Sequence, residues 1–355
     1  MPRRFALMLL LLGLPHLSPA QAPPLKSENV ILVTLDGMRW QEVFGGADAK
    51  LLRRAEPAAA PYAAPPTRQE LLPFLWTTVA AQGQLYGNRA LGNTVNVANH
   101  KHFSYPGYQE VLTGFADPHI HTNAPINNPH ASVLAVVSRT PAYQGRVAAF
   151  ASWEVLRNIL NAPCCDFLVN AGWQPAAGPG LSAREQQLNA SLGTAARPLG
   201  HERTDTLTFG YAFEYLQRAH PRVLYLSFGD TDELAHAGRH AGYLQAAHTA
   251  DACLGRLWAY LQARPQYRNK TTLLITTDHG RGRGRLWTSH GVHIPCSGQT
   301  WLALLGPDTP PTGEQQQRGQ LHQNQVAQTL ARLLGVPYCG EQPTGAAIQS
   351  VLASK

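Results

Sequence analysis

The chain has 355 residues, of which 44% are hydrophobic and 14% are charged, and its formal net charge is +7. This composition excludes an intrinsically disordered or fibrous protein, and the length suffices for one large domain or two medium ones. The positive charge is spread along the chain without a dense Lys/Arg block, so it does not indicate nucleic-acid binding and suits a small anionic substrate.

The N-terminal region has the pattern of a secretory signal. Arg3 and Arg4 precede an apolar run at residues 5–14, and small residues follow it. We therefore predict a signal peptide at 1–22 and export to the periplasm or the medium. The run is too short to span a bilayer, and we expect no membrane span in the mature chain. Five cysteines occur without a CxxC pair, which favours buried or structural thiols.

Residues 23–355 are predicted to form a single domain in which strands and helices alternate. In chain order we expect a strand at 30–35, a helix at 71–82, a strand at 95–98, a helix at 107–112, a strand at 146–151, helices at 153–160 and 204–218, a strand at 223–228, a helix at 243–263, strands at 273–276 and 301–305, and a helix at 323–334. This alternation predicts an α/β protein, a three-layer α/β/α sandwich with a mostly parallel central sheet. Residues 173–200 are rich in Ala, Gly and Pro and are interpreted as a loop-rich insertion.

Three of the predicted strands end in acidic residues. Asp36 follows the first strand, Asp230 and Asp232 follow the strand at 223–228, and Asp278 follows the strand at 273–276. In open α/β sheets, ligands bind beyond the carboxyl ends of the strands. We therefore expect these carboxylates to meet at one edge of the sheet and form a single polar site.

Histidines accompany these carboxylates at spacings that suit metal binding. Asp232 and His236 lie four residues apart and share one face if that segment is helical. His279 directly follows Asp278, and His290 comes eleven residues later. Mixed Asp/His sets favour Zn²⁺, and two metal ions about 3.5–4 Å apart stabilise phosphoryl transfer. A surface or helix-capping position is the plainer interpretation of His236 taken alone, so the prediction depends on the joint pattern.

Ser104 is the candidate nucleophile. It precedes Pro106, which suits a first helical turn, so Ser104 would lie at a helix N-terminus, where backbone N–H groups favour an anion. The alternative is that Ser104 only caps that helix. Asn123 could donate a hydrogen bond to a phosphate oxygen or could simply form a turn. Arg281 and the other cations beside these motifs could bind a substrate anion, although a solvated surface position is the plainer interpretation.

The motifs LVTLDG, FSYPGYQEVLTG, DTDELAHAG and TTDHG with SHG occur in that order between residues 29 and 307. Together they resemble the alkaline phosphatase superfamily, and in particular its type I phosphodiesterase/nucleotide pyrophosphatase-like branch. The resemblance implies that Ser104, a position held by Thr or Ser in that family, is the nucleophile and contacts one or both metal ions. It also implies two metal sites, with the ligand sets Asp232, His236 and His290 for one and Asp36, Asp278 and His279 for the other.

A neighbouring motif argues against sulfatase chemistry. Sulfatases carry Cys/Ser-x-Pro-x-Arg, whereas Tyr108 stands here in place of the arginine, so conversion of Ser104 to formylglycine is not expected. Nucleotide phosphodiesterases usually have Asn-His after the proline, and this chain has Gly107-Tyr108.

The predicted function is an exported hydrolase of phosphate mono- or diesters that uses two divalent metal ions, zinc or alternatively manganese, and a phosphoserine intermediate. One alternative is a manganese-dependent phosphomutase or a sulfatase-like member of the same superfamily. Another is a metal- or phosphate-binding protein without catalytic activity.

Overall fold

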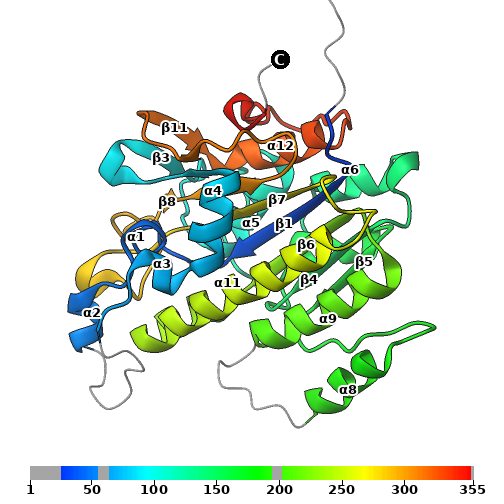
Figure 1. Cartoon of the computed structure of the whole chain (residues 1–355), viewed down its shortest axis with the longest axis horizontal. Coiled ribbons are helices and arrows are strands. Elements are labelled where there is room, and N and C mark those ends of the chain that lie inside the picture. The colour runs from blue at the N-terminus through cyan, green and yellow to red at the C-terminus, as the bar shows by residue number, and fades with distance from the viewer. Residues whose placement is uncertain (1–24, 55–63, 194–201, 353–355) are drawn as a thin grey trace, which may run out of the picture.

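The centre of the molecule is a mixed sheet of eight strands. The computed structural model describes residues 25–54, 64–193 and 202–352, and Figure 1 shows the strands running across its middle. The strand order is β10-β2-β9-β7-β1-β6-β4-β5, and β1 is paired in parallel with both β7 and β6. In that order the strands are β10 (Gly313–Glu314), β2 (Gln84–Tyr86), β9 (Leu302–Leu305), β7 (Thr271–Thr276), β1 (Asn29–Leu35), β6 (Val223–Phe228), β4 (Val147–Ala151) and β5 (Leu168–Ala171).

Strand β1 is buried along its whole length because both of its faces are covered. Ile31 and Val33 belong to one buried cluster, while Val30 and Leu32 belong to a second cluster on the opposite face. Successive side chains of a strand point to opposite faces, so a strand in the middle layer is a nearly continuous apolar run, as residues 30–33 are here. This arrangement confirms the predicted three-layer architecture with a mostly parallel sheet.

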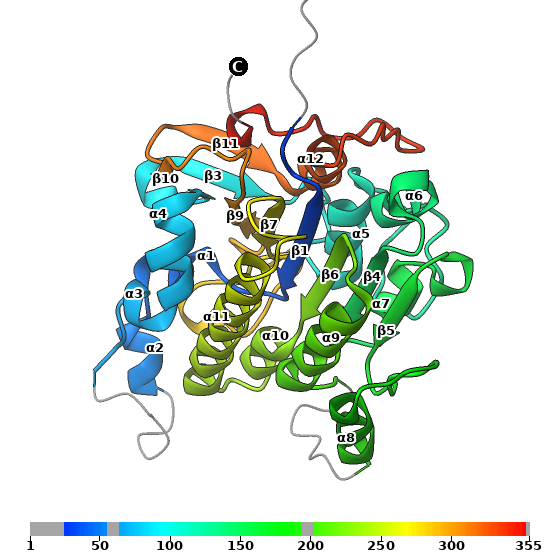
Figure 2. The same cartoon turned by 45° about the vertical axis from the view of Figure 1, so that its right-hand side comes forward.

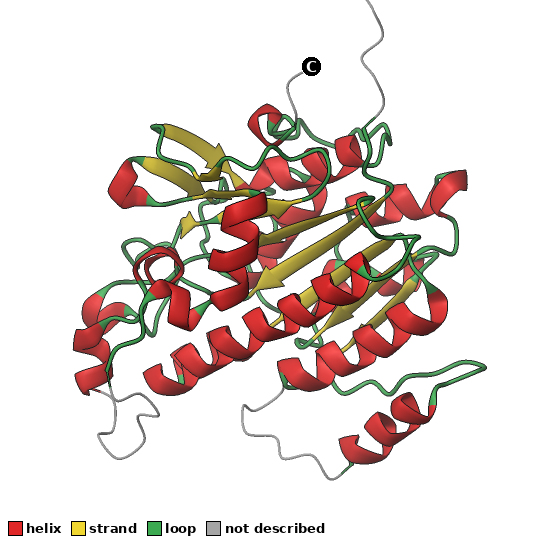
Figure 3. Cartoon of the chain, in the orientation of Figure 1, coloured by secondary structure: helices red, strands yellow, loops and turns green. Residues whose placement is uncertain are grey.

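Helices cover the two faces, as the views in Figures 2 and 3 show. The first face is covered by α1 (Trp40–Gly45), α2 (Ala49–Arg54), α3 (Arg68–Leu71), α4 (Ala80–Gln82), α8 (Ala183–Leu192), α9 (Asp205–Ala219), α10 (Asp230–His236) and α11 (His240–Gln262). The second face is covered by α5 (Ser104–Thr113), α6 (Val133–Arg139), α7 (Leu156–Ile159) and α12 (Val326–Leu333).

A second, three-stranded sheet lies beside the main one. Its order is β11 (Gly319–His322), β3 (Asn93–Asn96) and β8 (Gln299–Thr300), with β3 parallel to β11 and antiparallel to β8. The segment that leads from β3 to α5 carries residues 97–103, so this small sheet places the chain just before Ser104.

Two of the predicted elements differ from the structure. Residues 183–192, expected within a loop-rich insertion, form helix α8, which begins with a capping box between Ser182 and Glu185. The predicted helix at 71–82 is divided: α3 ends at Leu71, the chain bends at Leu72, and helical structure resumes at Pro73. Pro73 accounts for the break, because a proline disfavours the helical conformation of the residue before it.

The predicted signal peptide lies outside the described residues, as does the segment 194–201 of the expected insertion. In the part of the chain that the structure describes, no helix combines the length and apolar character needed to cross a membrane.

A cluster of ionisable side chains joins the loop after α5 to the C-terminal segment. His130 lies between two carboxylates, with Nε2 at 2.6 Å from Asp117 Oδ2 and Nδ1 at 2.7 Å from Glu341 Oε2. Burial lowers the pKa of His130, but the two carboxylates outweigh burial and raise this pKa above 6.5. His119, whose side chain is 91% exposed, contacts the other oxygen of Asp117.

This cluster predicts a pH-dependent contribution to stability. A group whose pKa is raised by folding stabilises the folded state fully below its unfolded pKa and loses that contribution as the pH rises through its folded pKa. We expect wild type to exceed His130→Gln in Tm by about 1–3 °C near pH 6, with the difference shrinking above the raised pKa of His130. Thermal unfolding from pH 5.5 to 9 measures this. His119→Gln should follow the wild-type profile, and a pH-independent difference for His130→Gln would contradict the prediction.

Candidate metal centre

The three acidic strand ends meet because their strands are neighbours in the sheet. Strands β7, β1 and β6 are adjacent, and Asp278, Asp36 and Asp232 follow their carboxyl ends. The backbone N–H of Gly37 donates to Asp278 Oδ1 at 3.1 Å, which joins the ends of β1 and β7. The structure therefore brings together the three carboxylates that the sequence placed at one edge.

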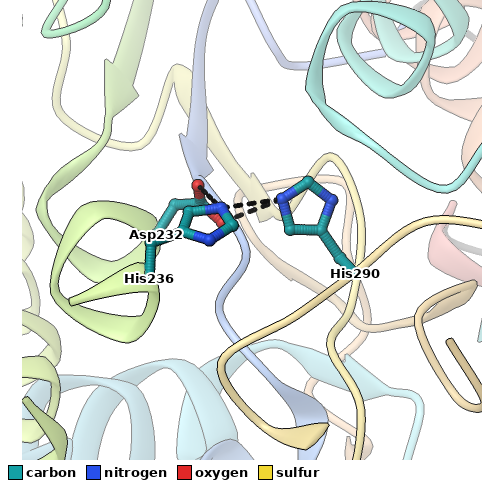
Figure 4. A group of neighbouring side chains, drawn as sticks. All are labelled: Asp232, His236 and His290. Carbon is teal, nitrogen blue, oxygen red and sulfur yellow. Dashed lines mark hydrogen bonds and ion pairs between the residues drawn. The ribbon is translucent and has the colours of Figure 1, made fainter. Parts of the chain in front are cut away.

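The first ligand group consists of Asp232, His236 and His290. Asp232 and His236 lie on α10, which is helical as their spacing required, and Figure 4 shows His290 pointing toward them from a separate loop. His236 Nε2 lies 3.0 Å from Asp232 Oδ2 and 2.9 Å from His290 Nε2. One ligand atom from each residue lies within 4.8 Å of the others.

The second ligand group surrounds His279. Its Nε2 atom lies 3.4 Å from Asp36 Oδ1, 3.3 Å from Asp278 Oδ2 and 3.9 Å from Asp232 Oδ1. Asp36, Asp232 and His279 satisfy the same 4.8 Å limit, so Asp232 lies between the two groups. The six residues expected to bind metal thus form one continuous cluster.

Two carboxylate oxygens of this cluster are buried without a hydrogen-bond partner. They are Asp36 Oδ1 and Asp278 Oδ2. A buried carboxylate oxygen without a partner is costly unless it binds a cation. Together with the imidazole nitrogens around them, these atoms form the oxygen and nitrogen donor set that Zn²⁺ prefers. The residues present therefore fit a pair of divalent ions.

The electrostatics of the cluster favour the same conclusion. Burial, followed by the charge of Asp232, raises the pKa of Asp278 to about 8, and burial together with Asp278 raises the pKa of Asp36 well above its usual value. Burial lowers the pKa of His290 to about 4 and holds the pKa of His279 well below its usual value, which favours neutral imidazoles that offer lone pairs. Cations are the groups that would relieve the repulsion among these carboxylates.

Hydrogen bonds hold the ligand side chains in orientations that suit metal binding. His279 Nδ1 lies 2.9 Å from Gly280 O, and His290 Nδ1 lies 3.3 Å from His102 O. A ring N–H at Nδ1 that donates to a carbonyl leaves Nε2 as the ligand atom. Tyr108 donates to Asp36 Oδ2 at 2.9 Å. The residue noted only as a departure from the sulfatase motif thus positions a ligand carboxylate.

Arg281 is buried, whereas the sequence favoured a solvated surface position for it. Its side chain forms an ion pair with Asp232. Burial would raise the pKa of Asp232, but Arg281 outweighs it, and with the nearby histidines it holds this pKa well below the usual range. Arg281 also donates to the carbonyl oxygens of Trp287 and Thr288, just before His290. Arg281 therefore joins the His290 loop to α10.

Ser104 and Asn123 lie together at the N-terminus of α5. Ser104 is the first residue of α5, is buried, and has its Oγ 3.3 Å from His279 Nε2. Asn123 Oδ1 accepts from the backbone N–H of Tyr105 at 2.9 Å. The N-cap position belongs to Phe103, so Ser104 is not the capping residue that the alternative interpretation required.

Comparisons with known proteins agree with this geometry. Residues 194–338 match the family model described as the metalloenzyme superfamily. The match includes α10, β7 and the His290 loop. A 2,3-bisphosphoglycerate-independent phosphoglycerate mutase from Synechococcus sp. (strain JA-2-3B'a(2-13)) is 29% identical over 133 residues, which cover 36% of this chain and 24% of the mutase. The chain thus matches only about a quarter of the length of this relative.

Solved structures show the same fold over almost the whole chain. A mutant of alkaline phosphatase PafA has a TM-score of 0.62 at 10% identity, covering 94% of this chain and 100% of PafA. Murine ectonucleotide pyrophosphatase/phosphodiesterase 5 has a TM-score of 0.58 at 13% identity, covering 92% of this chain and all of that chain. A phosphonate monoester hydrolase from Silicibacter pomeroyi has a TM-score of 0.58 at 14% identity, covering 92% of this chain and 76% of the hydrolase.

The fold is therefore alkaline phosphatase-like. The similarity extends to a phosphatase, a phosphodiesterase and a phosphonate hydrolase, so the nucleotide pyrophosphatase-like branch remains a prediction from the motifs.

Asp278→Asn tests whether the buried carboxylates need cations. The substitution removes a carboxyl group whose pKa is raised on folding by burial and by Asp232, a shift that destabilises the folded state at neutral pH, so we expect the Tm of the metal-free protein to rise. We also expect bound zinc to fall from two ions to about one per chain. Thermal unfolding with and without a chelator, combined with elemental analysis, measures both effects. The exposed Asp166→Asn serves as the control, and unchanged zinc binding by Asp278→Asn would be evidence against the assignment.

Arg281→Gln tests the connection between the His290 loop and α10. Without the guanidinium, Asp232 loses its ion pair and two carbonyl oxygens lose their donor, so we expect zinc to be retained about 10-fold less tightly. Competition against a chelator measures the affinity. Arg285→Gln, an exposed position in the same loop, should bind zinc as wild type does; equal affinities for all three proteins would show that Arg281 has no positioning role.

Proposed function

We propose that this chain is an exported hydrolase of phosphate mono- or diesters that uses two zinc ions and a phosphoserine intermediate. The observation that carries the proposal is the position of Ser104. Its hydroxyl lies at the N-terminus of a ten-residue helix and 3.3 Å from His279, beside two groups of candidate metal ligands. An activated hydroxyl next to paired cations is the arrangement that phosphoryl transfer requires.

The residues that would hold the metal ions are the two ligand groups described above. Bound divalent ions supply the positive charge that stabilises the anionic transition state of phosphoryl transfer. The mixture of carboxylates and imidazoles favours zinc, with manganese as the alternative.

Helix α5 provides the remaining features of a phosphate site. Its first backbone N–H groups and its dipole favour an anion next to Ser104. Gly107 lets α5 pack directly on the turn that carries Asp278, because a Cβ at this position would clash with the carbonyl oxygen of Asp278. The backbone N–H of Tyr105 donates to Asn123 Oδ1 and holds this side chain beside Ser104. The amide NH₂ group of Asn123 is left to donate to a phosphate oxygen.

The reaction proceeds in two displacements. In the first, Ser104 Oγ forms a bond to phosphorus and the bond from phosphorus to the alcohol oxygen breaks; the serine proton passes to solvent and the departing alkoxide takes a proton from water. In the second, water attacks phosphorus, the bond to Ser104 Oγ breaks, and phosphate or its monoester leaves while the serine hydroxyl is restored.

One observation favours a second candidate function. The similarity to phosphoglycerate mutases over 133 residues suits an enzyme that returns the phosphoryl group to another hydroxyl of its substrate. Incubation with 3-phosphoglycerate separates the two: a mutase forms 2-phosphoglycerate, whereas a hydrolase releases inorganic phosphate.

Ser104→Ala tests the nucleophile. We expect kcat for para-nitrophenyl phosphate, or for its bis ester, to fall by at least about 10³-fold because no other hydroxyl replaces the attacking atom. Zinc content, measured on the same samples, should stay close to wild type. Ser104→Thr keeps a hydroxyl at this position and should retain part of the activity. Undiminished turnover by Ser104→Ala would show that Ser104 is not the nucleophile.

A further inference from the structure

A groove of about 490 Å³ lies where the small sheet meets the segment before Ser104. Strand β8 contributes Gln299 and strand β11 contributes Gln320 and His322, while His100, His102 and Cys296 come from the adjoining loops. None of these residues belongs to the candidate ligand groups.

Two adjoining segments that line the groove contact the candidate metal centre. The segment at 296–299 is bonded to the turn that carries His279, because Gly280 N donates to Ser297 O at 2.7 Å. A Cβ at Gly280 would clash with the carbonyl oxygen of Gln299, so the two segments are in direct contact. The adjoining segment carries His102, whose Nδ1 lies 3.2 Å from Ser297 Oγ and whose carbonyl oxygen lies 3.3 Å from His290 Nδ1. Ser104 follows two residues later. An ester bound at Ser104 would therefore have the groove beside it.

The walls of the groove are held in a strained conformation. His102 and Cys296 have positive φ angles of 56° and 74°, which residues other than glycine rarely adopt. Asn99 Oδ1 accepts from the backbone N–H groups of Lys101 and His102, both at 2.9 Å. The buried carboxylate of Glu110 in turn accepts from Asn99 N at 2.8 Å. Strain that the surroundings enforce in this way is typical of preorganised binding sites.

The chemistry of the lining indicates what the groove binds. Its lining residues, all of them described, include no carboxylate, no lysine or arginine, and no Phe, Tyr or Trp ring. The indole N–H of Trp40 donates to Gln299 Oε1 at 3.0 Å, so the Gln299 amide NH₂ group remains available as a donor. Imidazoles and amides can donate to and accept from hydroxyl groups, and no Phe, Tyr or Trp ring among these lining residues offers a nucleobase a large stacking surface.

We propose that this groove is the leaving-group subsite of the metal centre and that it binds the hydroxyl-bearing part of a sugar or polyol phosphate. The inference rests on the proposed phosphoester chemistry and adds the class of substrate. Gln299 is the specificity residue, and it acts on the alcohol part of the ester without contacting the phosphoryl group.

Alkylation of Cys296 tests occupancy of the groove without requiring turnover. All five cysteines are free thiols, and Cys164 and Cys339 are exposed residues that do not line the groove. In zinc-loaded Ser104→Ala protein, saturating glucose 6-phosphate should slow the alkylation of Cys296 by at least about fivefold and leave Cys164 and Cys339 unchanged. Peptide mass spectrometry gives the rate at each site. Equal protection by inorganic phosphate, or no protection at all, would overturn the proposal.

Steady-state kinetics test the role of Gln299. Gln299→Leu should raise KM for glucose 6-phosphate by about tenfold through the loss of one hydrogen bond, and should change KM for para-nitrophenyl phosphate, whose leaving group carries no hydroxyl substituent, by much less. Gln316→Leu, at an exposed position outside the groove, is the matched control. Equal changes for both substrates would refute the subsite. Absence of turnover on either substrate by wild type would instead refute the proposed function, while the alkylation experiment would still report on the groove.

Discussion

One edge of the sheet buries three carboxylates, and the positive charge beside them is too small to balance theirs. Asp36, Asp232 and Asp278 follow three adjacent strands, and the only guanidinium group that the described structure pairs with them is that of Arg281 on Asp232. Asp36 and Asp278 each keep a buried oxygen without a partner. Such an arrangement is unfavourable in the absence of a cation, so the fold of this edge is best explained as a fold for binding metal.

The positions of the ligands follow from the topology of the sheet. Parallel strands direct their carboxyl ends to one edge, and β1 lies between β7 and β6 in the sheet although the three are far apart in sequence. The remaining candidate ligands are His236 on α10, His279 in the turn after β7 and His290 in the loop that follows that turn. Arg281 joins that loop to the helix, so the two ligand groups are positioned together. Metal binding and the conformation of residues 281–290 should therefore be coupled.

Much of this arrangement could be predicted from the sequence. Apolar runs that end in Asp identified β1, β6 and β7, and the spacing of Asp232 and His236 indicated a shared helical face. The sequence did not reveal that Arg281 is buried, because a cation in a Gly-rich loop has the same pattern whether it faces solvent or a carboxylate. The role of Tyr108 was missed for a similar reason: its hydrogen bond to Asp36 depends on the packing of α5 against β1, which no local pattern encodes. Helix α8 was missed because its composition is polar, although Ser182 and Glu185 form the capping box that would have indicated its start.

The most direct test of the central claim is to locate the metal ions themselves. A crystal of the zinc-loaded protein, measured at wavelengths on both sides of the zinc absorption edge, should show two anomalous peaks. One peak is expected among Asp36, Asp278 and His279, and the other among Asp232, His236 and His290. A structure without anomalous density at these residues, or with zinc bound elsewhere in the molecule, would contradict the account.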